Sequence, residues 1–243
     1  MGAADTAQSE GLEQRLTHAA EARTVLPEPA LKAMWSRVRE ETTAASPGLL
    51  TRLREQPTAV RVVLAMGVAM VVSAALVLAL EPRDDLADVT IERYAVAMSG
   101  LILLAAAGFA VSLRGAHQKP LRGWAWAVIA LSLGIPVALA AMPSLWVPEG
   151  VVVPATDTGY GCTALGILTG GLVSVPAFLL QRGAVPVVLR ACAAVAAGGV
   201  VAFGLLDVHC PSRDVTHLVV GHAGVGAVLV AVAAAAVVWR RRG

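Results

Sequence analysis

The chain has 243 residues, of which 57% are hydrophobic and only 15% are charged, and its formal net charge is +2. Globular domains carry about 25% charged residues, so the composition argues against an ordinary soluble domain, and it also excludes disordered, collagen-like and disulfide-rich secreted chains. The small net charge gives no indication of a nucleic-acid partner. The charges are unevenly placed, because residues 1–61 hold eight of the 17 acidic and eight of the 19 basic side chains. We therefore predict a soluble helical head, residues 1–61, followed by a membrane domain, residues 62–243.

The head is expected to present an apolar stripe on a helix that runs from Pro29 to about Thr43. The stripe occupies positions i, i+3, i+4 and i+7 of one helix face, and its members are Leu31, Met34, Trp35 and Val38. Two short helices cannot build a large core of their own, so the stripe must meet a companion helix, the membrane surface or a partner protein. Membrane-surface helices favour Lys and Arg on the polar face, whereas this face carries mixed charges. A partner protein is therefore the favoured interpretation.

Six segments of the membrane domain are long and apolar enough to cross a membrane, which takes about 20 residues for a hydrocarbon core of about 30 Å. Five of them contain no Asp, Glu, Lys or Arg, and the other contains only Arg190 near one end. They offer no polar face to water, which argues against a soluble helical core. We expect an all-α polytopic membrane protein, with a six-helix transmembrane bundle and a small N-terminal cytoplasmic helical region. The predicted spans are 62–80, 95–113, 124–142, 163–181, 187–206 and 218–238.

The basic residues that flank the spans are asymmetric. Eleven Lys and Arg side chains flank the side shared by the two termini, and three flank the opposite side. Loops on the cytoplasmic side carry the excess of Lys and Arg. We therefore predict that the N- and C-termini are both cytoplasmic and that the loops 81–94, 143–162 and 207–217 are external.

The candidate chemistry lies on the predicted external side. Cys162 is at the start of the fourth span, and Cys210 follows the fifth span within the motif DVHCP (207–211). These two cysteines can form a permanent disulfide, act as a reversible thiol pair, or bind a soft metal together with imidazole from His209 or His217. We therefore take Cys162, Cys210, His209 and His217 as candidate signal-sensing residues, and the sequence does not specify a metal.

The other notable residues of the membrane domain have structural interpretations. Cys192 lies among Ala and Val residues and is interpreted as a small buried hydrophobe, and His222 as a hydrogen-bonding residue between packed helices. Gly166 and Gly170 have the spacing of a GxxxG motif and predict close helix packing. The sequence contains no Gly-rich phosphate loop, no catalytic triad pattern and no His-Glu-x-x-His motif. We therefore predict neither an enzyme nor a cofactor.

The layout and several motifs resemble a family of membrane regulators. A soluble head of about fifty residues, six short spans and the external Cys162 before a Gly-rich span resemble the NrsF family of membrane-bound anti-sigma factors. The stretch AAGG (196–199) leading to His209-Cys210-Pro211 and the final span is similar to that family as well. The layout is also similar to that of CarR, a light-response anti-sigma factor of carotenoid regulation. The resemblance covers most of the chain.

The resemblance implies a regulatory binding protein of the bacterial inner membrane. The head would bind an extracytoplasmic-function sigma factor and keep it from RNA polymerase, without direct contact with nucleic acid. An external metal or oxidant, sensed at Cys162 and Cys210, would release the sigma factor. Two other functions fit the same features less well. A membrane thiol or quinone redox protein is disfavoured because no Cys-x-x-Cys pair is present, and a small transporter is disfavoured because the spans lack charged residues at their centres.

Overall fold

The computed structural model describes residues 28–30, 32–36, 48–80, 82, 91–114, 118, 122–142, 159–181, 188–212 and 214–242. The chain divides into two compact units, Met1–Gly48 and Leu49–Gly243. The described residues contain helices and no strands, and six helices are long and apolar enough to cross a membrane. The prediction of an all-α, six-span membrane protein is confirmed.

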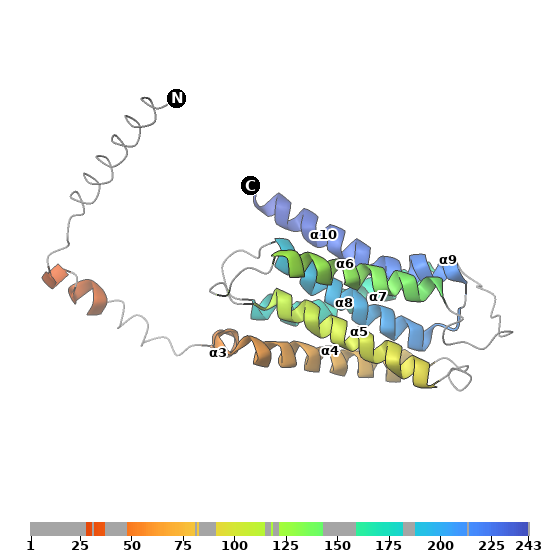
Figure 1. The fold of residues 1–243 in the computed structure, drawn as a ribbon. Coiled ribbons are helices and arrows are strands. Elements are labelled where there is room, and N and C mark those ends of the chain that lie inside the picture. Colours follow the sequence, from red (N-terminus) through yellow and green to blue (C-terminus); the bar gives the residue numbers. More distant parts are fainter. Residues whose placement is uncertain are drawn as a thin grey trace, which may run out of the picture. The chain divides into compact units, whose positions relative to one another are not determined.

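The second unit is a bundle of six long helices that run lengthwise beside one another (Figure 1). A short helix, α3 (Leu49–Glu55), precedes the bundle, and α9 (Val215–His217) with the π-helical segment η3 (Leu218–Ala223) leads into its last helix. The long helices are α4 (Thr58–Leu80), α5 (Ile91–Ser112), α6 (Arg122–Ala141), α7 (Tyr160–Leu180), α8 (Val188–His209) and α10 (Gly224–Arg240). Successive long helices run in opposite directions (Figure 1). The start of α7, the end of α8 and α9 therefore share one end of the bundle, the α9 end, and the end of α7 shares the other end, the α3 end, with α3.

Helix α8 is the centre of the bundle. Of the residues in its apolar window, 83% are buried, compared with 11% for α4. Small residues fill most of its central part, from Ala191 to Gly204. Small residues allow neighbouring helices to approach closely in a membrane. Helix α8 accordingly packs against α4, α5, α6, α7 and α10. By contrast, large apolar side chains cover the outside of the bundle, including Val71, Leu103, Leu168 and Val232, as expected of a surface that faces lipid.

Helices α7 and α8 touch backbone to backbone at Gly170 and Gly198. A Cβ atom added to Gly198 would collide with the Ser174 hydroxyl and the Gly170 carbonyl oxygen. The same hydroxyl donates to the Gly170 oxygen of its own helix at 2.6 Å and to the Ala194 oxygen of α8 at 3.2 Å. The close packing that the spacing of Gly166 and Gly170 predicted is therefore present, and it joins α7 to α8 at the middle of α7.

Replacing Gly198 with alanine is expected to lower the free energy of unfolding by about 1–3 kcal/mol, because the added methyl group overpacks a rigid backbone contact. Thermal unfolding in lipid nanodiscs measures this effect. Gly204→Ala is the matched control on the same helix, since its added Cβ would lie at ordinary contact distances, 3.5 Å or more, from Met98 and Leu101. Equal destabilisation by the two substitutions would contradict the packing described for α7 and α8.

Part of the predicted apolar stripe is described. Residues 28–30 and 32–36 are helical, and the side chains of Met34 and Trp35 are 45% and 58% exposed. Leu31 and Val38 lie outside the described residues. The two described residues of the stripe, Met34 and Trp35, are therefore exposed and available to a partner.

Two boundaries differ from those predicted. Contacts divide the chain after Gly48, so residues 49–61 belong with the bundle, and Arg61 lies inside α4 with 1% of its surface exposed. Helix α8 runs through His209, so Asp207 is a buried residue of its last turn and not part of a loop. Both shifts have the same cause, which is that polar side chains at the ends of long helices pack among neighbouring helices.

Candidate metal site at the α9 end of the bundle

Four side chains that can bind a metal meet at the α9 end of the bundle. They are Cys162, Cys210, His217 and His222, and the ligand atoms they offer all lie within 4.8 Å of one another. They come from the start of α7, the residue that follows α8, α9 and η3. Residues separated by up to 60 positions in the sequence are therefore gathered at one point, and we refer to these four residues as the Cys/His cluster.

The loop between α8 and α9 positions Cys210 and His217. Helix α8 ends at His209, and the restriction that Pro211 places on the residue before it favours termination at this point. Asp214 then caps α9, because its side-chain oxygen accepts a hydrogen bond from the His217 backbone N–H at 2.7 Å. This short, capped connection brings the Cys210 sulfur to 3.4 Å from Nε2 of His217.

Two glycines allow the start of α7 to approach this loop. Gly159 precedes α7 in a left-handed conformation with φ 76°, and a Cβ atom placed on it would lie 3.2 Å from Nδ1 of His217. Gly221 faces the same backbone, since its added Cβ would lie 3.2 Å from the Gly159 carbonyl oxygen. Positive φ is readily adopted only by glycine. The close approach of Gly159 and Gly221 holds the first turn of α7, and with it Cys162, against the His217 ring.

The π-helical segment η3 brings His222 into the cluster. In a regular α-helix, residues five apart point about 140° away from each other. In η3 the Gly224 backbone N–H bonds instead to the Val219 carbonyl, five residues earlier, and this wider turn places residues i and i+5 near one face. The rings of His217 and His222 are accordingly neighbours, with centroids 5.4 Å apart and planes at 70°.

The cluster is buried, and its polar atoms are incompletely hydrogen-bonded. His222 is 0% exposed, and neither of its ring nitrogens makes a hydrogen bond. A hydrogen bond with the Cys162 side chain has the largest effect on the Cys210 thiol and lowers its pKa far below the ordinary value. Burial opposes this shift, and the His222 ring and the Ser212 backbone lower the pKa further. A buried polar group without a hydrogen-bond partner is costly, so the two ring nitrogens of His222 favour a site that binds a ligand.

The donor set fits a zinc-type ion. Two thiol sulfurs and two imidazole nitrogens form a Cys₂His₂ set, which binds zinc tetrahedrally at about 2.0–2.3 Å and so places neighbouring donor atoms about 3.3–3.8 Å apart. The 3.4 Å separation of the Cys210 sulfur and Nε2 of His217 already matches this spacing. The cluster contains no carboxylate, which disfavours Mg²⁺ and Ca²⁺, since these ions prefer oxygen ligands. Soft or borderline ions such as Zn²⁺, Cd²⁺ and Cu⁺ suit these four residues.

The structure brings together three of the four residues that the sequence singled out, namely Cys162, Cys210 and His217. His209 is the last residue of α8 and is not a member of the cluster. His222, interpreted from the sequence as a hydrogen-bonding packing residue, makes no hydrogen bond and joins the cluster instead. Helical periodicity assumes α-helical turns and therefore does not predict that His222 joins His217. The nearby Gly221 and Gly224 are a weak signal of an irregular turn.

The third cysteine is separate from this site. Cys192 is buried in α8, and its thiol lies 4.0 Å from the Val230 carbonyl oxygen of α10. The interpretation of Cys192 as a small buried residue is confirmed. It therefore provides a matched control for experiments on the two cysteines of the cluster.

Comparison of the chain with models of known protein families, with curated proteins and with solved structures finds no match. Any functional assignment therefore depends on the residues of the chain itself.

Proposed function

We propose that this chain is a membrane-bound anti-sigma factor that responds to a zinc-type metal ion bound by Cys162, Cys210, His217 and His222. The observation that carries the metal part of the proposal is the convergence of these four ligand atoms within 4.8 Å. The sigma-factor part is supported by the resemblance in layout and by the exposed helix that carries Met34 and Trp35. The protein would lie in the bacterial inner membrane with the head in the cytoplasm, as the excess of basic residues on that side supports.

A metal explains the cluster better than a disulfide does. A bond between Cys162 and Cys210 would use the two thiols and leave His217 and His222 without a role. A metal uses all four side chains and gives one of the two buried ring nitrogens of His222 a partner. Cysteines bind a metal in their deprotonated form, and the hydrogen bond with Cys162 that lowers the pKa of the Cys210 thiol favours this form at Cys210.

Regulation by a metal requires that the bundle has two states, one with the metal bound and one without it. The four ligands belong to α7, to the residue that follows α8 and to the α9–η3 segment, so a metal would draw three parts of the bundle together. A ligand shifts such an equilibrium only if it binds one state more tightly than the other. The metal-bound arrangement would have the lower affinity for the sigma factor, and metal and sigma factor would then oppose each other reciprocally.

The proposal is tested in cells that carry a reporter gene transcribed by the bound sigma factor. External Zn²⁺ or Cd²⁺ is expected to induce the reporter with the native protein. Cys162→Ser and Cys210→Ser should abolish induction while repression persists, because the head is unchanged. Cys192→Ser should behave as the native protein does. Metal-dependent induction that survives both cluster substitutions would refute the proposed site, and a reporter that is never repressed would refute the anti-sigma function.

A further inference from the structure

The α3 end of the bundle holds a pair of arginines that bind the end of α7. The Arg54 side chain donates from Nε to the Leu179 carbonyl oxygen at 2.7 Å, and Arg61 donates from Nη1 to the Leu180 carbonyl oxygen at 2.9 Å. The last four carbonyl groups of a helix have no partner within the helix, and positive charge at this terminus is favourable. We call Arg54 and Arg61 the arginine clamp.

The clamp also fixes the corner between α3 and α4. Arg61 donates from Nε to the Gln56 carbonyl oxygen at 3.1 Å and from Nη2 to the Thr58 hydroxyl at 3.2 Å. One buried guanidinium group thus joins the α3–α4 corner to the terminus of α7. Helix α3 begins directly after Gly48, where the first unit ends, so the clamp holds the segment through which the chain continues to the head.

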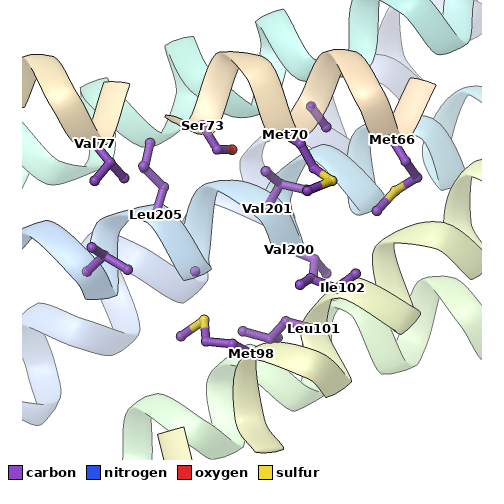
Figure 2. Close-up of a pocket in the computed structure, with 13 residues that line it drawn as sticks. Met66, Met70, Ser73, Val77, Met98, Leu101, Ile102, Val200, Val201 and Leu205 are labelled. Carbon is purple, nitrogen blue, oxygen red and sulfur yellow. The ribbon is translucent and has the colours of Figure 1, made fainter. Parts of the chain in front are cut away.

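Beyond Arg61, helix α4 is less tightly packed than the other long helices. It is the least buried of the six long helices, and a cavity of about 280 Å³ lies between it and helices α5 and α8. Figure 2 shows Met66 and Met70 of α4 on one side of this cavity and Met98 and Leu101 of α5 on the other. Methionine side chains are flexible and adapt to changes in packing. The cavity therefore gives α4 room to move relative to α5 and α8.

Helix α7 connects this clamp to the Cys/His cluster. Cys162 lies in its first turn and Leu180 is its last residue, a separation on the order of 27 Å along the helix. Between them, Gly170 is held against Gly198 of α8. One face of helix α7 is also buried from Gly166 to Leu180 against its neighbours, and the backbone contact at Gly170 is the tightest of these contacts. Because an α-helix is stiff, a small displacement of one end reaches the other end as a tilt about this contact.

We propose that α7 is a lever that pivots at Gly170 and, through the arginine clamp, carries the state of the Cys/His cluster to α3 and the head. The proposal rests on the proposed function, because it requires metal binding at Cys162. When Cys162 moves toward the other ligands, the opposite end of α7 shifts and moves the α3–α4 corner with it. Arg54 and Arg61 are positioning residues in this device and contact no metal.

The test uses the full-length protein in lipid nanodiscs, with Zn²⁺ as the probe and hydrogen exchange of residues 49–61 as the readout. In the native protein, Zn²⁺ is expected to change the exchange rate of this segment by about tenfold. Arg61→Gln should make the segment exchange quickly with and without Zn²⁺, since the corner is no longer held. The zinc affinity should stay within about threefold of the native value, because distant sites act independently when their coupling is cut.

If Arg61→Gln fails to fold, Arg54→Gln repeats the test at a half-buried position. Arg52→Gln, on the exposed face of α3, is the matched control. Zinc binding with no change in the exchange of residues 49–61 in the native protein would overturn the lever but not the metal site. A zinc-dependent change that persists in the clamp variants would also overturn the lever. Absence of zinc binding in the native protein would overturn both proposals.

Discussion

Cys210→Ser is expected to lower the affinity of the purified protein for Zn²⁺ by about 100-fold. Structural zinc sites bind with apparent free energies of about 10–16 kcal/mol, or about 3 kcal/mol for each of four ligands, and every 1.4 kcal/mol is a factor of ten. Serine preserves the size of the side chain but replaces a thiolate with a hydroxyl group, which is a poor zinc ligand at neutral pH. Cys210 is also the cluster thiol whose pKa is lowered by its neighbours, so the substitution removes the thiol that these neighbours make easier to ionise.

The affinity is measured by competition with a chelator of known affinity, using the full-length protein in nanodiscs. Cys192→Ser is the control, because it removes a cysteine from the same protein without touching the cluster and leaves a donor near the Val230 carbonyl oxygen. Equal zinc affinities of the native and Cys210→Ser proteins would show that the metal binds elsewhere. A loss of affinity in Cys192→Ser as large as in Cys210→Ser would show that unfolding, and not ligand loss, explains the result.

Trp35→Ala is expected to weaken binding of the proposed sigma-factor partner by about 30-fold or more. Trp side chains are frequent hot spots of protein interfaces, where truncation costs about 2–4 kcal/mol. Trp35 is 58% exposed, with Met34 beside it at 45%, so binding can bury much additional apolar surface. The effect is measured by titrating the detergent-solubilised protein with candidate extracytoplasmic-function sigma factors.

Ser36→Ala is the control for the stripe. Ser36 lies on the same helix but about 100° from Trp35 around the axis, and its hydroxyl donates a hydrogen bond to the Ala33 carbonyl oxygen at 2.9 Å. Ser36→Ala should therefore leave sigma binding unchanged. If a sigma factor binds the native and Trp35→Ala proteins equally well, the apolar stripe is not the binding surface.

The spans could be predicted from the sequence because the membrane imposes a length and an apolar composition on each helix separately. The predicted span 62–80 corresponds to α4, Thr58–Leu80, which begins four residues earlier and ends at the same residue. The predicted span 124–142 corresponds to α6, Arg122–Ala141, whose ends lie within two residues of the prediction. The helix ends differ by a few residues because polar side chains there find partners inside the protein. Arg61 is the clearest example, since the sequence assigned it to the basic flank of a span, whereas it is buried against the end of α7.

The site could be predicted only in part because its assembly depends on backbone detail. Membrane topology alone places Cys162 near Cys210, since both lie at the same end of their spans. The inclusion of His222 depends on the π-helical turn of η3, which no side-chain pattern specifies. The position of His217 depends on the Asp214 cap and on the left-handed Gly159. The roles of Arg54 and Arg61 depend on which helix ends meet, which the sequence of the spans does not determine.

X-ray absorption at the zinc edge of the full-length protein tests the central claim most directly. The Cys/His cluster predicts one zinc ion per chain with two sulfur neighbours at about 2.3 Å and two nitrogen neighbours at about 2.0–2.1 Å. His222→Gln should lose one imidazole from this shell while both sulfurs remain. A zinc shell of oxygen and nitrogen without sulfur, or a protein that binds no zinc, would contradict the account.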